Sequence, residues 1–401
     1  MRLRISKEHI PENIIIMMMF LPSLYYSLAN LVGGYTILYI ICFGCGMLSY
    51  VVLLRNSNAF LALLSFGIMS MLYSYVINPQ FGNYIISGFS IDLLSKSKLV
   101  LLWLLYFPLL AAAASKELDF RYLLDRLFYC SLIVLPLDIY INYQRMQSTV
   151  LTDYMTIAYQ ILFWVFIAFL WEVQNKKRAT WVLIGPAMFM LIVGGSRGAL
   201  LCLITMLLLT YVFVYLGKVN KKSIKTFVPV LIALAAILVI FNMKNVLGLL
   251  EMVTSRMGYN SRVLTQISNI NFFNNEDRVG LQMQVIPHLG DKVFGFGLFG
   301  DRFLISSGQY IHNFFLELLT DFGLIIGGAI IIYIIVISFK AVKICWSSKN
   351  SNAIYFIIIS IVFVYVKFMI SASYLESTEC FFAVGILYNI VRFRGGIKYE
   401  T

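Results

Sequence analysis

Residues 308–338 read GQYIHNFFLELLTDFGLIIGGAIIIYIIVIS, a polar start followed by a long apolar run. The apolar run from position 313 onward exceeds the ~20 residues that an α-helix needs to cross a bilayer, so it predicts a transmembrane helix. His312, one of only 3 histidines in the chain, lies where the polar stretch ends. A titratable imidazole at the boundary between water and lipid suggests proton chemistry at a membrane surface.

Similar apolar runs recur along the whole chain. Hydrophobic residues make up 60% of the 401 residues and charged residues only 12%, unlike any soluble globular protein of this length. We therefore expect an all-α integral membrane protein with about 12 transmembrane helices. The first run lacks a small-residue cleavage site, so it is interpreted as a span and not as a signal peptide. The expected spans lie near residues 13–32, 35–54, 58–77, 99–114, 127–143, 154–173, 180–194, 199–216, 227–241, 313–338, 353–371 and 378–391.

The positive charges predict how the chain is oriented in the membrane. Lysine and arginine collect in cytoplasmic loops, and placing both termini in the cytoplasm puts most of the 31 Lys and Arg residues inside. The net charge of +12 is then explained by the anionic lipid that it faces, and no nucleic-acid partner is expected. The 6 cysteines form no visible disulfide or metal framework.

Nearly all connections between the expected spans are short, so residues 1–401 are expected to form one polytopic membrane domain. The main exception is the segment 242–311, a large outside loop between the ninth and tenth spans. Within it, Val279–His288 has the pattern of a short amphipathic helix at the membrane interface. The sequence GFGLFG at 295–300 predicts a flexible apolar loop that cannot form a regular helix.

Three arginines on the outer side are candidates for binding phosphate. Arg197 lies in GGSRG at 194–198, where glycines let the backbone approach a ligand and the planar guanidinium suits phosphate oxygens. Arg278 and Arg302 lie in the large loop. Each arginine also has a simpler interpretation: a snorkelling side chain at a tight helical hairpin for Arg197, and a solvated surface charge for the other two.

A polar stripe continues from His312 into the expected helix. Asn313, Glu317 and Asp321 are spaced at i, i+4 and i+8 and so share one helix face. Because intramembrane carboxylates seldom face lipid, we expect Glu317 to pair with Lys367, which should lie at the same depth in the next span. The simpler interpretation of His312 itself is an interfacial or helix-capping residue.

With these elements in place, the chain resembles the bacterial O-antigen polymerase and O-antigen ligase superfamily. The resemblance covers residues 180–330, and the N-terminal half matches only as a set of spans. The ligase pattern usually spaces its glycines as Gly-x-x-Gly, whereas three residues separate Gly323 from Gly327, which favours the polymerase. The motifs that carry the resemblance are GGSRG at 194–198, Arg278, Pro287 and GFG at 295–297, and His312-Asn313 followed by Gly323, Gly327 and Gly328.

The resemblance implies a bundle similar to the GT-C glycosyltransferases in the bacterial inner membrane, with a periplasmic active site. Such enzymes transfer a glycan from undecaprenyl pyrophosphate to an acceptor hydroxyl. On this chain, Arg197 and Arg278 would hold the pyrophosphate and His312 would activate the hydroxyl as general base. Arg302 is our own addition to the pyrophosphate site. Asn313, Glu317 and Lys367 are expected to support the site from the polar stripe and its partner.

The expected partners are a lipid-linked oligosaccharide donor, a lipid-linked acceptor and membrane lipids, with a chain-length regulator as a further candidate. No His/Cys set or carboxylate cluster with metal spacing occurs, so neither a metal nor a cofactor is expected. Three alternatives stay open. The first is an O-antigen ligase that uses the lipid A core as acceptor, the second is a flippase or other transporter of lipid-linked oligosaccharides, and the third is a scaffold protein.

Overall fold

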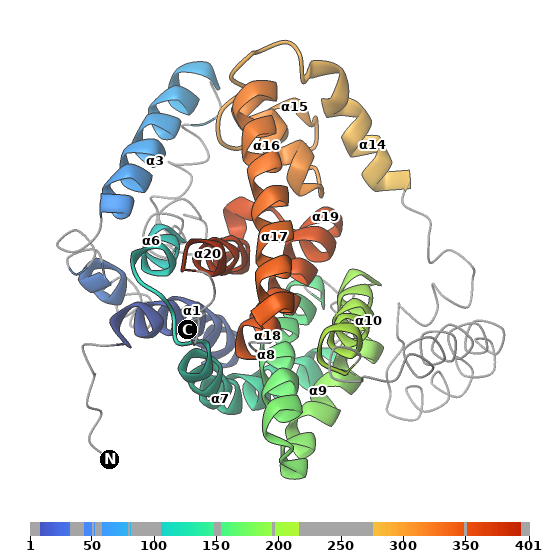
Figure 1. Cartoon of the computed structure of the whole chain (residues 1–401). Helices are drawn as coiled ribbons and strands as arrows, with labels where there is room; N and C mark the ends of the chain where they lie inside the picture. Colours follow the sequence, from blue (N-terminus) through green and yellow to red (C-terminus); the bar gives the residue numbers. More distant parts are fainter. Residues whose placement is uncertain are drawn as a thin grey trace, which may run out of the picture. The chain divides into compact units, whose positions relative to one another are not determined.

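Figure 1 shows the structure of the protein, a computed structural model. It describes residues 9–32, 44–49, 52, 58–78, 81, 106–147, 154–194, 197–215, 276–348 and 351–393. Every regular element within these ranges is a helix, as expected for an all-α protein. The chain divides into two compact units, one formed by Met1–Leu127 with Asn275–Thr401 and the other by Phe128–Asn274.

The first unit joins the N-terminal and C-terminal parts of the chain. Two of its apolar runs are interrupted by a π-helical turn: Gly323–Gly327 lies between α16 and α17, and Phe363–Lys367 lies between α18 and α19. Its helices are α1 (Ile10–Val32), α3 (Asn58–Ile77), α6 (Phe107–Ser115), the start of α7 (Phe120–Gln147), α14 (Glu276–Val285), α15 (Gly300–Leu304), α16 (Phe314–Phe322), α17 (Gly328–Ser348), α18 (Ser351–Val362), α19 (Phe368–Ile370) and α20 (Thr378–Phe393).

The centre of this unit is the contact between α6 and α20. The alanines of α6 are buried, and a Cβ on Gly385 of α20 would lie 3.0 Å from the Cβ of Ala113, so small residues let the two helices approach closely. Asn389 donates to the carbonyls of Ala113 (2.6 Å) and Lys116 (2.7 Å). Arg392 donates to Ala114 (3.0 Å). These bonds satisfy carbonyls that the end of α6 would otherwise leave unpaired.

Three helices among the described residues are long and apolar enough to cross a membrane: Phe60–Ile77, Phe314–Trp346 and Asn352–Ile370. The first of them, within α3, carries large exposed apolar side chains such as Met69, Leu72 and Val76 along its length. A helix that is apolar on all sides and still exposed is stable in lipid but not in water. The chain is therefore an all-α protein with membrane-spanning helices.

Many of the described helices coincide with expected spans. α3 has the bounds expected for 58–77, and α20 differs from 378–391 by only two residues at its end. The tenth expected span is longer than predicted, since apolar helix continues from 314 to 346. The expected spans 35–54 and 99–114 are described only in part, and 227–241 lies outside the described residues. The full set of about 12 spans and the GT-C-like arrangement stay predictions.

The second unit contains the rest of α7, then α8 (Tyr154–Asn175), α9 (Trp181–Gly194) and α10 (Arg197–Thr210). α8 is apolar and almost completely buried from Ala158 to Glu172. It contacts α9 and α10, and the Trp171 ring stacks on Phe128 of α7 with 3.7 Å between centroids. Arg178–Thr180 forms a short 3-10 turn that leads from α8 into α9.

Candidate functional site

His312 lies at a bend in the irregular segment that connects α15 to α16. Its backbone φ is 55°, in the left-handed region that side chains other than glycine seldom adopt. The segment is held on both sides: Asn313 caps the following helix, and the amide of the preceding Ile311 donates to Asp301 Oδ2 at 2.9 Å. Ile311 is fully buried against Val285 and Ile305. The backbone of His312 is therefore fixed by its neighbours.

Asn313 is the N-cap of α16. Its Oδ1 accepts hydrogen bonds from the amides of Phe315 (3.1 Å) and Leu316 (3.2 Å). This is the ordinary role of an asparagine at a helix start, where backbone amides lack partners within the helix. The capping residue is thus Asn313, and His312 immediately precedes the cap.

Arg302 and His312 lie on the same aromatic residue. The imidazole ring of His312 is 3.9 Å from the ring of Tyr310, measured between centroids. The guanidinium carbon of Arg302 is 6.0 Å from the Tyr310 centroid and 4.6 Å from that of Phe299. Stacking on aromatic faces holds a guanidinium in place by cation–π attraction. The structure therefore brings a base candidate and a phosphate-binding candidate together.

Arg278 lies on α14 (Glu276–Val285), which overlaps most of the short amphipathic helix predicted at Val279–His288. Leu281 and Val285 follow it at i+3 and i+7, so the three share one face of the helix. Val285 and Leu281 pack into the cluster that contains Ile311. The Arg278 side chain is half-buried and forms no ion pair with any described residue. Its helix is thus packed against the segment that carries His312.

Arg197 is the first residue of α10 in the second unit. Its side chain, and the preceding residues 195–196 of the GGSRG motif, lie outside the part of the chain that the structure describes. The expected meeting of Arg197 with His312 therefore stays a prediction.

Two buried carboxylates lie on α16 below His312. Glu317 accepts hydrogen bonds from the Ser373 hydroxyl and from the Tyr374 amide (3.2 Å). Asp321 accepts from the Tyr374 hydroxyl (2.6 Å) and from the Gly300 amide (3.0 Å). Burial, followed by the nearby charges of Asp321 and Glu317, raises the pKa of Tyr374 well above its ordinary value, so its hydroxyl stays a donor.

The expected pair between Glu317 and Lys367 is wrong. Lys367 forms its ion pair with Glu379 of α20 at 3.0 Å, and its ammonium lies 4.9 Å from the ring of Phe363. Equal depth of Glu317 and Lys367 in neighbouring helices does not pair them, because the segment between α19 and α20 also lies against Glu317. Ser373 and Tyr374 of that segment donate hydrogen bonds to Glu317 in place of Lys367.

The glycine-rich segment 295–300 is buried, which corrects the expectation of a flexible loop. It is irregular, as predicted, but the amides of Phe296 and Gly297 donate to the carbonyls of Thr320 (2.8 Å) and Asp321 (3.0 Å) at the end of α16. Gly295 and Gly323 both have positive φ and approach each other so closely that a Cβ on Gly323 would lie 2.5 Å from the Gly295 amide nitrogen. Only glycine fits at this contact.

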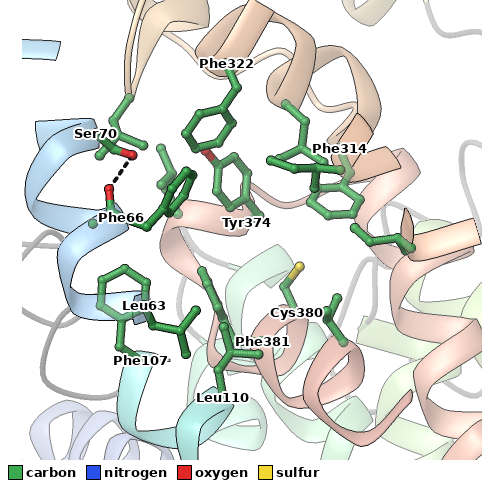
Figure 2. Close-up of a pocket in the computed structure, with 17 residues that line it drawn as sticks. Leu63, Phe66, Ser70, Phe107, Leu110, Phe314, Phe322, Tyr374, Cys380 and Phe381 are labelled. Carbon is green, nitrogen blue, oxygen red and sulfur yellow. Dashed lines mark hydrogen bonds between the residues drawn. The ribbon is translucent and has the colours of Figure 1, made fainter. Parts of the chain in front are cut away.

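An apolar pocket of about 190 Å³ lies beside the two carboxylates. Figure 2 shows aromatic side chains from several helices around it, including Phe66 of α3, Phe314 of α16 and Phe381 of α20. The hydroxyl of Ser70 in its wall donates to the carbonyl of Phe66 at 2.8 Å. The wall therefore offers contacts suited to a hydrocarbon and not to a polar ligand. Phe314, two residues from His312, joins the pocket to the segment described above.

No family model, curated protein or solved structure matches this chain. Within the described residues, no group of three or more His, Cys, Asp and Glu side chains is placed to hold a metal ion. The functional assignment therefore rests on the arrangement of the side chains and on the resemblance of the motifs.

Two tyrosines of the site were missed by the sequence analysis. Tyr310 lies only two positions before His312, but the left-handed bend at His312 belongs to no strand or helix period that would predict the contact between the two rings. Tyr374 lies in a short connection between helices, where nothing in the local pattern predicts a bond to Asp321.

Proposed function

We propose that the protein is a membrane glycosyltransferase that uses a polyprenyl-pyrophosphate-linked glycan, and specifically a polymerase of surface-polysaccharide repeat units. The observation that supports this most strongly is the grouping of Arg302, Tyr310 and His312 next to an apolar pocket. A lipid-linked sugar pyrophosphate requires a cation for the pyrophosphate, a base for the acceptor and an apolar surface for the lipid. All three chemistries occur in one compact unit.

In the proposed reaction the acceptor hydroxyl attacks the anomeric carbon of the donor sugar. His312 takes the hydroxyl proton as the new C–O bond forms, and the bond from the anomeric carbon to the pyrophosphate oxygen breaks. The electron pair of that bond leaves with the pyrophosphate, whose negative charge Arg302 stabilises. Direct attack inverts the anomeric centre. No metal takes part in this reaction, as the resemblance implies.

Arg278 and Arg197 join the pyrophosphate site in this proposal. The half-buried guanidinium of Arg278, without an ion pair among the described residues, suits a ligand that supplies the counter-charge. Arg197 is included on the resemblance of its motif alone. Asn313 has a positioning role through the cap of α16, which fixes the helix start after His312.

The pocket supports an undecaprenyl chain as the lipid of the donor. Its wall is largely apolar and aromatic, and it lies in the unit that contains His312. An isoprenoid hydrocarbon would bury apolar surface there at ~25 cal/mol per Å². We place the enzyme in the bacterial inner membrane, with both termini cytoplasmic and the site facing the periplasm. The O-antigen ligase reaction, with the lipid A core as acceptor, is the nearest alternative.

One feature favours a second candidate function, transport of lipid-linked oligosaccharide across the membrane. The apolar helix Phe314–Trp346 is interrupted at Gly323–Gly327, and two buried carboxylates, Glu317 and Asp321, precede the break. Transporters often place interrupted helices and ionisable groups at their substrate sites. Here the carboxylates accept bonds from protein donors, which suits a structural role better.

Depletion of the protein separates these functions. Cells that lack a polymerase should carry single repeat units on the lipid A core, as seen by gel electrophoresis of surface polysaccharide. Loss of a ligase should leave long chains on undecaprenyl pyrophosphate, and loss of a transporter should trap single units on the cytoplasmic side. Long chains stranded on the carrier would contradict the polymerase proposal.

A further inference from the structure

The second unit has a separate pocket with a buried acid. The pocket has a volume of about 540 Å³. It is lined by residues of α8, the turn after α8, the start of α9 and the π-helical turn Tyr211–Tyr215 after α10, among them Phe169, Trp181 and Val214. Glu172 contributes its carboxylate from the last turn of α8, where it is only 7% exposed. Within the described part of the chain, Glu172 Oε2 is buried without a hydrogen-bond partner.

A buried carboxylate oxygen without a donor is unfavourable, since that oxygen has lost water without gaining a hydrogen bond in return. Two cations, Lys176 and Arg178, line the same pocket and are exposed. Neither forms an ion pair with Glu172 in the described structure. The pocket wall therefore carries one buried negative group and two exposed positive groups. A ligand that has both a positive and a negative charge could neutralise all of them.

The position of Lys176 is fixed by its backbone at the end of α8. Lys176 has φ 55°, in the left-handed region, and its amide donates to the Glu172 carbonyl at 2.7 Å as α8 ends. The exposed Trp181 begins α9 and packs edge-on against Phe169, with ring centroids 6.1 Å apart. Tryptophan and cationic side chains at the ends of apolar helices are typical of the membrane–water interface. The residue types around the pocket are therefore those that suit contact with lipid headgroups.

We propose that this pocket binds the headgroup of an ethanolamine phospholipid, with the ammonium at Glu172 and the phosphate at Lys176 and Arg178. An ethanolamine headgroup carries an ammonium and a phosphate joined by two carbons, and its ammonium has three N–H donors for a carboxylate. A guanidinium and an ammonium suit the phosphate oxygens. The apolar wall of Phe169, Trp181 and Val214 then contacts the lipid next to its headgroup.

Native mass spectrometry of the full-length protein from mixed vesicles tests this proposal. The vesicles contain equal amounts of phosphatidylethanolamine, its dimethyl derivative, phosphatidylcholine and phosphatidylglycerol. We expect retention to fall in the order phosphatidylethanolamine, dimethyl derivative, phosphatidylcholine, because each methyl group removes a donor to Glu172. Phosphatidylglycerol, which lacks the ammonium, should also be retained less. Equal retention of the four lipids by the wild-type protein would by itself overturn the proposal.

Glu172→Gln, which keeps the volume and removes the charge, should reduce the preference for phosphatidylethanolamine about tenfold. Lys176→Ala with Arg178→Ala should reduce retention of every phospholipid. Two matched controls should leave retention unchanged: Glu117→Gln at an exposed acid, and Lys177→Ala, whose ammonium lies over Trp171. An unchanged preference in folded Glu172→Gln would refute the assignment of the ammonium to this carboxylate.

Discussion

At the residue scale, the conformation of His312 depends on bonds made by its neighbours. The left-handed backbone is less unfavourable for histidine than for a β-branched residue, but it still requires support from both sides. Asp301 accepts a hydrogen bond from the amide of Ile311, and the side chain of Asn313 caps the start of α16. A substitution at His312 therefore has to be separated from a change in this backbone before it is interpreted as a loss of chemistry.

The cap at Asn313 has a measurable effect on stability. Asn313→Ala should lower the free energy of unfolding by about 1 kcal/mol, because the amides of Phe315 and Leu316 lose their acceptor. Thermal unfolding in detergent measures the change. Asn313→Asp keeps an acceptor oxygen and should retain most of the stability, and equal losses in the two variants would show that the cap is unimportant.

The hydroxyl of Tyr374 provides a second test among single residues. Tyr374→Phe should cost about 1–3 kcal/mol, since Asp321 would stay buried with one donor fewer. Tyr365→Phe is the matched control, because that hydroxyl donates to the hydroxyl of Ser338 and not to a carboxylate. A Tyr365→Phe loss as large as that of Tyr374→Phe would contradict the importance of the bond to Asp321.

At the scale of elements, the contact between the glycine-rich segment and the end of α16 fixes the loop below His312. Gly323→Ala should destabilise the protein strongly, by about 3 kcal/mol or more, since φ is 74° and the new Cβ would lie 2.1 Å from the Val293 carbonyl oxygen. Gly328→Ala, at the start of α17, is the control, because a Cβ there meets nothing within 4 Å.

Thermal unfolding of the two alanine variants distinguishes two effects on stability: loss of the close contact at Gly323 and the change in helix propensity. Gly328→Ala should be neutral or stabilising, as alanine favours helix. If Gly323→Ala were as stable as Gly328→Ala, the close approach of the segment to α16 would be wrong.

The ion pair between α18–α19 and α20 can be assigned by a double substitution. Lys367→Met should cost about 3 kcal/mol, because it leaves the largely buried Glu379 carboxylate without its cation. Adding Glu379→Gln should recover most of the lost stability, whereas adding Glu317→Gln should recover none. Recovery by Glu317→Gln and not by Glu379→Gln would restore the pairing expected from sequence.

At the scale of the whole molecule, the helices were predictable and their irregular connections were not. The length of the apolar run alone predicts α3 and the helix after His312, since any long apolar run is stable as a helix in lipid. The bonds of Glu317 could not be predicted, because they come from Ser373 and Tyr374, more than fifty positions away in a connection without periodicity. Similarly, the burial of Gly295–Gly300 depends on a tertiary contact with α16 that sequence hydropathy does not contain.

The candidate site residues are divided between the two units of the chain. Arg302 and His312 belong to the same unit, and both lie close to the ring of Tyr310. The sequence predicted only that both residues lie on the outer side of the membrane. Arg197 belongs to the other unit, and its motif supplies the reason to include it. Arg197→Lys tests that inclusion in a transfer assay, since lysine keeps the charge but loses the planar fork.

The most direct test of the central claim is glycosyl transfer by purified protein in lipid bilayers, with a labelled polyprenyl-pyrophosphate repeat unit as donor and acceptor. His312→Ala should abolish chain elongation while expression and unfolding temperature stay near those of the wild type. His312→Asn should be equally inactive, although asparagine accepts the left-handed backbone. Elongation at the normal rate in folded His312→Ala, or its rescue by asparagine, would contradict the assignment of His312 as the general base.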